Sequence, residues 1–171
     1  MLAGHIGKYS RYEIERKFLL QKLPHDVPDQ YVDFEDLYLL NSSLRLRIEK
    51  SPEGKVLQRK LTMKDKSPEN GPTTCVITSL YLSESDFNAL GSLKGSHLQK
   101  RRYAREDENN RITFDVFQGS LEGLVLAEIE FLNHDACRKF EVPDSSWKEV
   151  TEDSKYSGGY LAHSTQESKR S

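Results

Sequence analysis

The sequence has few cysteines, no long apolar segment and no dominant sign of charge. Cys75 and Cys137 lie far apart, without a CxxC pair or a Cys/His cluster, which argues against a disulfide scaffold and against a zinc site. No run of about 18 apolar residues is present that would span a membrane. Lysine and arginine number 25 against 27 for aspartate and glutamate, and a net charge of −2 does not indicate a nucleic-acid-binding protein.

The 171 residues correspond to one domain, at about 150 residues per domain. Charged residues make up 30% and hydrophobic residues 36%, and 8 tyrosines and 7 phenylalanines help to supply a core. Residues 1–17 are rich in charge, which excludes an apolar signal-peptide core there, so we expect a cytoplasmic protein. We predict a single domain over residues 1–162 and a polar, disordered tail over 163–171.

Most of the chain alternates polar and apolar residues with a period of two, which predicts strands. The eight candidate strands are residues 12–20, 32–40, 43–50, 55–64, 73–82, 97–106, 111–117 and 124–131. Short helices are expected after Ser83, which is a suitable N-cap, near 134–140, and from Thr151 to Gly158. Many antiparallel strands with few helices predict an α+β fold that is mostly antiparallel β.

Charged side chains share one face of several predicted strands, because successive strand residues point to opposite faces. In the first strand, Glu13, Glu15 and Lys17 lie opposite Ile14 and Phe18. The same alternation separates charged from apolar residues in strands 43–50, 55–64, 111–117 and 124–131. A solvated face explains any single strand of this kind. Paired acids on two strands and paired cations on two others form a more informative pattern.

The acid pairs point to a bound cation. Glu13 and Glu15 are two residues apart, about 7 Å along a strand, and so are Glu128 and Glu130. Such carboxylates repel each other unless a cation lies between them. A hard divalent ion with oxygen ligands, Mg²⁺ or Mn²⁺, is the natural candidate. About half of the cations on the charged faces are arginines, whose forked guanidinium fits phosphate oxygens.

Eight strands are about the number that closes into a small barrel. If the charged faces point inward, acids and bases line a tunnel, which is costly unless they are paired, hydrated or holding a ligand. A phosphate chain bound with a metal suits both sets, because acids hold the metal while bases hold phosphate oxygens. We therefore predict a closed eight-stranded β-barrel tunnel with a few helices packed outside it.

Several segments resemble, in order along the chain, the motifs of the CYTH superfamily of triphosphate tunnel metalloenzymes. Residues 13–17 (EIERK) resemble the ExExK motif of that family. The further matches are 44–47 (LRLR), 61–64 (LTMK), 100–103 (KRRY), 112–117 (ITFDVF), 127–130 (AEIE) and the closing segment 150–162. Together they extend over residues 12–162, nearly the whole chain.

The resemblance implies a tunnel that binds a triphosphate moiety with one or two divalent metals, Mg²⁺ or Mn²⁺. Members include inorganic triphosphatases, thiamine triphosphatases, class IV adenylate cyclases and RNA triphosphatases. The positions that match metal-binding acids are Glu13, Glu15, Asp115, Glu128 and Glu130. The positions that match phosphate-binding bases are Lys17, Arg45, Arg47, Lys64, Lys100, Arg102 and Lys155. The catalytic residues expected on this basis are Glu13, Glu15, Lys17, Glu128 and Glu130.

One stretch departs from the pattern of the family. Where the family usually has a strand of RxExE type, residues 72–83 contain no acid and no base. Thr74, Cys75, Ile77 and Ser79 stand near the positions where charge is expected. Either this chain lacks part of a second metal or phosphate site, or the alignment slips at this strand.

The leading hypothesis is divalent-metal-dependent hydrolysis of a triphosphate. The resemblance favours inorganic tripolyphosphate, because the chain is short and its residues 13–20 are EIERKFLL, as in many short bacterial members. A class IV-type adenylate cyclase is one alternative, although no segment suggests contacts to adenine. A module that binds triphosphate or polyphosphate without turnover is another, suggested by the uncharged strand. We expect a small-molecule partner, no nucleic acid or membrane, and a monomer or homodimer.

Overall fold

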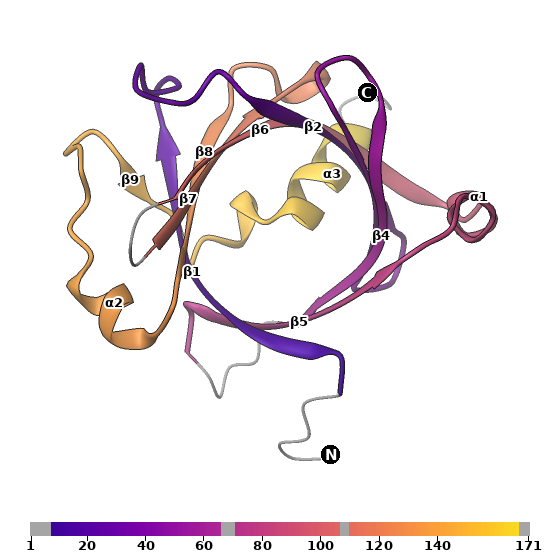
Figure 1. Ribbon diagram of the computed structural model, residues 1–171, viewed down its shortest axis with the longest axis horizontal. Coiled ribbons are helices and arrows are strands. Elements are labelled where there is room, and N and C mark those ends of the chain that lie inside the picture. The colour runs from indigo at the N-terminus through magenta and orange to yellow at the C-terminus, as the bar shows by residue number, and fades with distance from the viewer. Residues whose placement is uncertain (1–7, 66–70, 107–109, 168–171) are drawn as a thin grey trace.

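The computed structural model describes residues 8–65, 71–106 and 110–167 and shows a closed barrel of eight antiparallel strands (Figure 1). The strands are β1 (Ser10–Leu20), β2 (Tyr31–Leu39), β3 (Leu44–Lys50), β4 (Val56–Asp65), β5 (Thr74–Tyr81), β6 (Gly95–Glu106), β7 (Asn110–Phe117) and β8 (Val125–Phe131). The predicted barrel is confirmed, because each of the eight expected segments forms one of these strands.

The strands are ordered β5-β4-β3-β2-β6-β7-β8-β1, and β1 closes the ring by pairing with β5. The two ends of β1 have different partners: Ser10–Ile14 pairs with β5, and Ile14–Leu20 pairs with β8. A ninth strand, β9 (Lys148–Glu149), adds to β1 beside Phe18 and Leu19. Two residues are too few to show a period, so the sequence pattern did not predict β9.

The hydrophobic core lies mainly outside the barrel, because the apolar face of each strand points outward. On one side, α2 (His134–Lys139) and the segment after it cover a cluster that includes Phe18, Phe114 and Trp147. On another side, α1 (Glu84–Gly91) packs Phe87 and Leu90 against Leu46 and its neighbours. Figure 1 shows both helices outside the ring. The barrel interior is thereby left to the charged faces.

The third helix, α3 (Gly158–Glu167), differs from the predicted arrangement in place and in bounds. It lies within the ring of strands in Figure 1, where Leu161 and Ala162 pack against Leu98, Phe117 and Leu126 at one end of the barrel. Two short 3₁₀ helices accompany it, η2 (Gly119–Leu121) and η3 (Ser154–Tyr156). The expectation of helices outside the barrel therefore holds for α1 and α2 only.

Gly158 begins α3, whereas the sequence pattern placed the end of a helix there. The polar segment expected to be a tail from residue 163 is also helical as far as Glu167. The ring Nδ1 of His163 lies 2.7 Å from the hydroxyl oxygen of Ser96, which anchors this turn to β6. Residues 168–171 of the predicted tail lie outside the described residues. Among the helices that the structure describes, none is long and apolar enough to cross a membrane.

The start of α3 requires glycine at one position. A Cβ atom on Gly158 would overlap the hydroxyl group of Tyr38 and lie 2.8 Å from its Cζ, whereas one on Gly159 would come no closer than 3.7 Å to that ring. We predict that Gly158→Ala lowers the free energy of unfolding by about 1–3 kcal/mol, because α3 or Tyr38 must shift. Gly159→Ala is the matched control, with a change below about 1 kcal/mol. Urea denaturation measures both, and equal stability of the two variants would contradict the close packing.

Candidate active site

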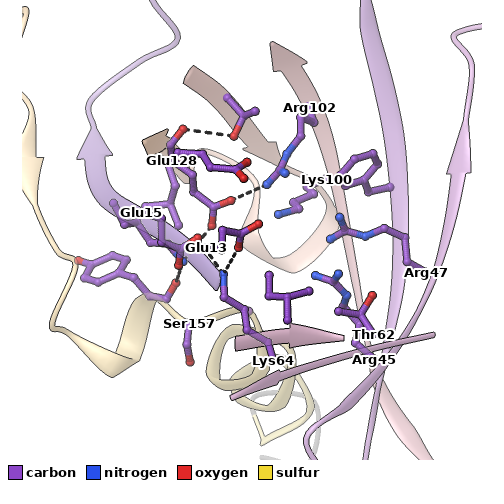
Figure 2. Close-up of a pocket in the computed structure, with 18 of the residues that line it drawn as sticks. Glu13, Glu15, Arg45, Arg47, Thr62, Lys64, Lys100, Arg102, Glu128 and Ser157 are labelled. Carbon is purple, nitrogen blue, oxygen red and sulfur yellow. Dashed lines mark hydrogen bonds and ion pairs between the residues drawn. The ribbon is translucent and has the colours of Figure 1, made fainter. Parts of the chain in front are cut away.

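The inward faces of the strands enclose a cavity of about 860 Å³, which residues 150–158 bound at one end (Figure 2). Of the predicted site residues, those that line it are Glu13, Glu15, Lys17, Arg45, Arg47, Lys64, Lys100, Arg102, Glu128 and Glu130. Alternation along each strand therefore brings together residues from five strands, β1, β3, β4, β6 and β8.

One side of the cavity carries four glutamates, which we call the acid wall: Glu13 and Glu15 on β1, and Glu128 and Glu130 on β8. The register of the two strands explains their proximity, because Glu15 pairs with Glu130 and Lys17 pairs with Glu128. Burial and the nearby charges of Glu13 and Glu15 raise the pKa of Glu130. The surroundings of Glu130 thus disfavour its negative charge, which a bound cation would stabilise.

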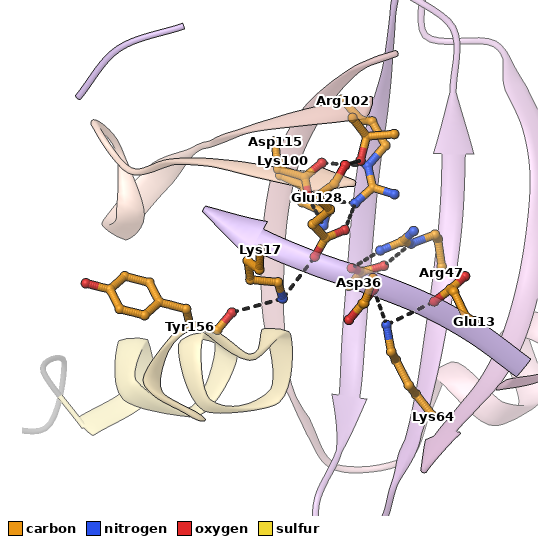
Figure 3. Close-up of polar contacts among 12 residues, drawn as sticks. Glu13, Lys17, Asp36, Arg47, Lys64, Lys100, Arg102, Asp115, Glu128 and Tyr156 are labelled. Carbon is orange, nitrogen blue, oxygen red and sulfur yellow. Dashed lines mark hydrogen bonds and ion pairs between the residues drawn. The ribbon is translucent and has the colours of Figure 1, made fainter. Parts of the chain in front are cut away.

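Lysines from two strands already contact this wall. The Nζ atom of Lys64 lies 3.1 Å from a carboxylate oxygen of Glu13 and 2.8 Å from one of Glu15. The Nζ atom of Lys17 lies 2.9 Å from Glu128 and donates a hydrogen bond of 3.3 Å to the carbonyl oxygen of Tyr156 (Figure 3). Burial alone would raise the pKa of Glu128, but the charges of Lys17 and Arg102 outweigh it and hold that pKa well below its usual range.

The opposite side of the ring carries the cation wall, formed by Arg45 and Arg47 on β3, Lys60 on β4 and Lys100 on β6. The Nε atom of Arg45 is buried and has no hydrogen-bond partner among the described residues. Lys60 donates to Glu49 over 2.7 Å. Arg45 therefore keeps one buried guanidinium donor without a hydrogen bond, 3.9 Å from the Asp36 carboxylate.

Lys100 is the cation most changed by its surroundings. Burial lowers its pKa to about 8, and the repulsion of Arg102 and Arg47 acts in the same direction against the attraction of Asp115. Its ammonium also lies 5.6 Å from the ring centre of Phe117, an apolar neighbour. An amine with such a pKa is partly neutral near pH 7 to 8, whereas an ordinary lysine is fully protonated there.

Asp115, one of the predicted metal ligands, lies beside two bases. Its two carboxylate oxygens accept hydrogen bonds of 2.6 Å each from Nε and Nη2 of Arg102, and Lys100 binds the same carboxylate. The side chain is 1% exposed and lies behind these bases rather than on the cavity surface. Both of its oxygens orient these cations, and metal binding by Asp115 stays a prediction.

Asp36 performs the same task for β3 and was missed. It accepts hydrogen bonds of 2.6 and 2.7 Å from Arg47 and lies 3.9 Å from Nε of Arg45. Burial alone would raise its pKa, but the charges of Arg47 and Arg45 lower it to about 2. The segment around it contains three acids, Asp33, Glu35 and Asp36, on both faces of β2, so alternation alone did not single one out.

Other lining residues had a weaker signal in the sequence. Lys60 shares its strand face with Lys64, so the alternation that selected Lys64 also pointed to Lys60. Arg11 and Arg111 lie at the rim beside the acid wall, where Arg11 is 3.1 Å from Glu13. Lys155 is exposed and is not among the described residues that line the cavity, and its contact with phosphate stays a prediction.

The uncharged strand is a real feature of the molecule. β5 pairs with both β4 and β1, and its register places Cys75 opposite Glu13, Ile77 opposite Lys64, and Ser79 opposite Thr62. Ile77 and Ser79 line the cavity, and the hydroxyl oxygen of Ser79 lies 3.1 Å from that of Thr62. Residues 74–81 therefore form the strand between β4 and β1, and this part of the interior is neutral.

The acid wall offers the type of ligand atom that a hard divalent cation prefers, but its carboxylates are not grouped around one point. Carboxylate oxygens are the ligands that Mg²⁺ and Mn²⁺ prefer, and Glu13, Glu15 and Glu130 share one wall. Within the described residues, however, no group of three or more acidic, histidine or cysteine side chains is positioned to hold a metal ion. The ammonium of Lys64 contacts both Glu13 and Glu15.

The Asp36–Arg47 pair should contribute strongly to stability. We predict that Asp36→Asn lowers the free energy of unfolding by about 3–5 kcal/mol, because it leaves the buried Arg47 charge unpaired. Asp33→Asn is the matched control on the same strand, where an outward pair with Arg101 is partly exposed and should contribute at most about 1 kcal/mol. Chemical denaturation at pH 7 measures both, and a similar loss in the two variants would contradict this assignment.

The same pair sets a dependence on pH. The folded-state pKa of Asp36, about 2, lies below its ordinary value of 3.8, so its contribution is complete above about pH 4 and is lost as the pH falls towards 2. The decline in unfolding free energy between pH 5 and pH 2 should therefore be shallower in Asp36→Asn than in the wild type. Equal slopes would show that Asp36 is not the titrating group.

Comparison with known proteins finds relatives that match nearly the whole chain. The inorganic triphosphatase of Nitrosomonas europaea is 30% identical over 152 residues, which cover 88% of this chain and 96% of that protein. A crystal structure of an inorganic triphosphatase matches with a TM-score of 0.57 and 29% identity, over 88% of this chain and 93% of that one. No protein-family model matches the chain.

A more distant structure shares the fold alone. A putative adenylate cyclase from Bacillus halodurans has a TM-score of 0.52 at 16% identity and covers 76% of this chain and 86% of its own. The identity to the triphosphatase extends over nearly the full length of both chains, and the matched motifs line one charged cavity. The chain therefore belongs to the CYTH-like triphosphate tunnel family.

Proposed function

We propose that this protein hydrolyses a triphosphate with the help of a divalent cation, and that inorganic tripolyphosphate is its substrate. The observation that carries the proposal is that one enclosed cavity places an acid wall opposite a cation wall. The similarity to an inorganic triphosphatase over 88% of the chain supports the same reaction class. A chain of phosphate groups carries enough negative charge to interact with both walls, directly on one side and through a metal on the other.

The cation wall would hold the phosphate oxygens. Arg47 is fixed by the two hydrogen bonds that it donates to Asp36, and Arg102, which lies next to Lys100 on the inward face of β6, is fixed by the two that it donates to Asp115. Because these guanidinium groups are oriented before substrate arrives, less side-chain entropy is lost on binding. Donors held in place in this way can stabilise the charge that develops on the transferred phosphoryl group and on the leaving pyrophosphate.

The acid wall would hold the metal through Glu13, Glu15 and Glu130, with Glu128 beside them. A bound Mg²⁺ or Mn²⁺ would supply charge neutralisation at the phosphate oxygens. Glu130 supports this role because burial and repulsion from Glu13 and Glu15 raise its pKa, and a divalent cation would relieve that repulsion.

Lys100 is the residue best suited to accept the proton of the attacking water. Its pKa of about 8 lets the neutral amine exist near physiological pH, while the buried glutamate nearest to it, Glu128, is held ionised by cations. In the reaction, the water oxygen bonds to phosphorus, the anhydride P–O bond breaks, and the water proton passes to the amine of Lys100. The positive charge then lies beside Asp115, which already binds this side chain.

The lining favours an inorganic substrate over a nucleotide. The ring of Phe34 lies on the cavity surface, but the guanidinium of Arg47 covers it at 4.0 Å from the ring centre. A face covered in this way is not free to stack on a nucleobase. The uncharged β5 surface is the feature that favours the second candidate, a module that binds triphosphate without turnover, and the assay below separates the two.

Hydrolysis should depend on a divalent cation and on the acid wall. We expect phosphate release from tripolyphosphate with Mg²⁺ or Mn²⁺ and none in EDTA, and less release from ATP or thiamine triphosphate. Glu130→Gln should lower kcat about 100-fold or more, because a metal ligand is lost. Glu35→Gln is the control, since Glu35 pairs with Lys50 outside the cavity. Turnover that persists in EDTA, or in Glu130→Gln, would refute the metal role, and tight binding without release would indicate a binding module.

Turnover should also report the proton transfer at Lys100. If the neutral amine is required, kcat rises with pH and reaches half of its maximum at about pH 8 or above, because bound phosphate favours the charged amine. Lys100→Arg keeps the positive charge but cannot lose it, so kcat should fall about 100-fold or more with a smaller change in KM. A wild-type kcat in Lys100→Arg would show that Lys100 only binds phosphate.

A further inference from the structure

Lys64 lies in an unusual position for a residue expected to bind phosphate. Its Nζ atom contacts Glu13 and Glu15 at 3.1 and 2.8 Å, although β4 and β1 are not neighbours in the ring. β5 lies between them, and its residues Cys75 and Ile77 carry no charge. Figure 2 shows the Lys64 side chain extended across this surface to the two glutamates. The neutral strand therefore makes the contact possible, because an acid or base on β5 would compete for it.

This contact compensates the charge that a metal would otherwise compensate. Glu128 likewise forms ion pairs with Lys17 at 2.9 Å and with Arg102 at 2.6 Å. Among the acid wall, Glu130 has the longest approach to a cation, 3.8 Å from Arg11. A divalent ion that uses Glu13 and Glu15 must therefore displace the ammonium of Lys64, and the displaced ammonium then requires another anion.

We infer that Lys64 is an exchangeable counter-ion, which holds Glu13 and Glu15 in the absence of metal and passes to the phosphate chain when a divalent cation takes those carboxylates. The inference rests on the proposed function and adds a coupling to it. Without phosphate, a metal ion must compete with the ammonium of Lys64 for the two carboxylates. Without metal, phosphate must compete with the same two carboxylates for Lys64. When both are present, the metal replaces Lys64 at the two carboxylates and the phosphate chain replaces them at Lys64. Each ligand therefore raises the affinity of the other by the same factor.

The chain contains a matched control for this idea. Lys60 is on the same strand and the same inward face, four residues before Lys64, but its ammonium is bound to Glu49 at 2.7 Å. Both lysines contribute one positive charge to the same cavity. Removing either one changes the overall potential, but only removing Lys64 takes an ammonium away from Glu13 and Glu15, while Arg11 still contacts Glu13. The two substitutions therefore separate direct competition from a general effect of charge.

The test is binding of Mn²⁺ alone at pH 7.5, followed by the electron paramagnetic resonance signal of the free ion. Lys64→Met should bind Mn²⁺ about tenfold more tightly than the wild type, or better, because the competing ammonium is gone. Lys60→Met should bind within about twofold of the wild type, and Lys64→Arg should bind as weakly as the wild type. Circular dichroism checks that each barrel is folded, and Lys64→Gln makes the same comparison if the methionine variant does not fold.

The outcomes distinguish this inference from the proposed function. Equal Mn²⁺ affinity in Lys64→Met and the wild type, or an equal gain in Lys60→Met, would overturn the exchange while metal-dependent hydrolysis by the wild type could still stand. If Mn²⁺ binds to none of the variants and the wild type turns over without a divalent cation, the proposed function fails and the exchange fails with it.

Discussion

Charge buried inside a closed β-barrel must be balanced by charge of opposite sign, and the interior of this protein is organised by that requirement. Asp36 and Asp115 are both 1% exposed and each binds an arginine through two hydrogen bonds. Removing one partner of such a pair leaves an uncompensated buried charge, so these pairs are fixed parts of the fold. The glutamates of the acid wall are more exposed, up to 36% for Glu130, and their cations can exchange. Exposure thus distinguishes the two aspartates that orient arginines from the glutamates proposed to hold a metal.

The barrel can hold charge inside because its apolar contacts are made outside. Phe18, Phe114 and Ile129 point outward and are buried under the segment that contains α2, while Leu37 and Leu46 are covered by α1. Hydrophobic burial therefore stabilises the strands without filling the interior. α3 is the exception, because it packs apolar residues against the inward-facing Leu98 and Leu126 and closes one end of the cavity. The result is a rigid wall around a charged space, which suits a site that must hold an anion and a metal together.

Most of the charged residues that line the cavity were predicted from the alternation of side chains along the strands. Glu13, Glu15 and Lys17 had to share a face, and so did Arg45 and Arg47, because the period of a strand is two. α3 was not predicted with its correct bounds, because it begins at a Gly-Gly pair, which usually marks the end of a helix. β9 was not predicted, because two residues are too few to show a period. The exposed position of Lys155 and the burial of Asp115 behind Arg102 were also beyond sequence reasoning. Motif position shows that a residue is near the site, but not whether its polar atoms are already occupied.

The sequence by itself determined the strand faces, the closure of about eight strands into a barrel and the resemblance to a triphosphate tunnel family, because these depend on local period and motif order. The tertiary structure alone decided which charges are paired. Lys64 reaches Glu13 and Glu15 only because ring closure brings β4, β5 and β1 together, and Asp36 contacts Arg47 only through the register of β2 and β3. Ion pairs form between atoms within a few ångströms, and the distances between residues far apart in the sequence are set by strand register and barrel closure.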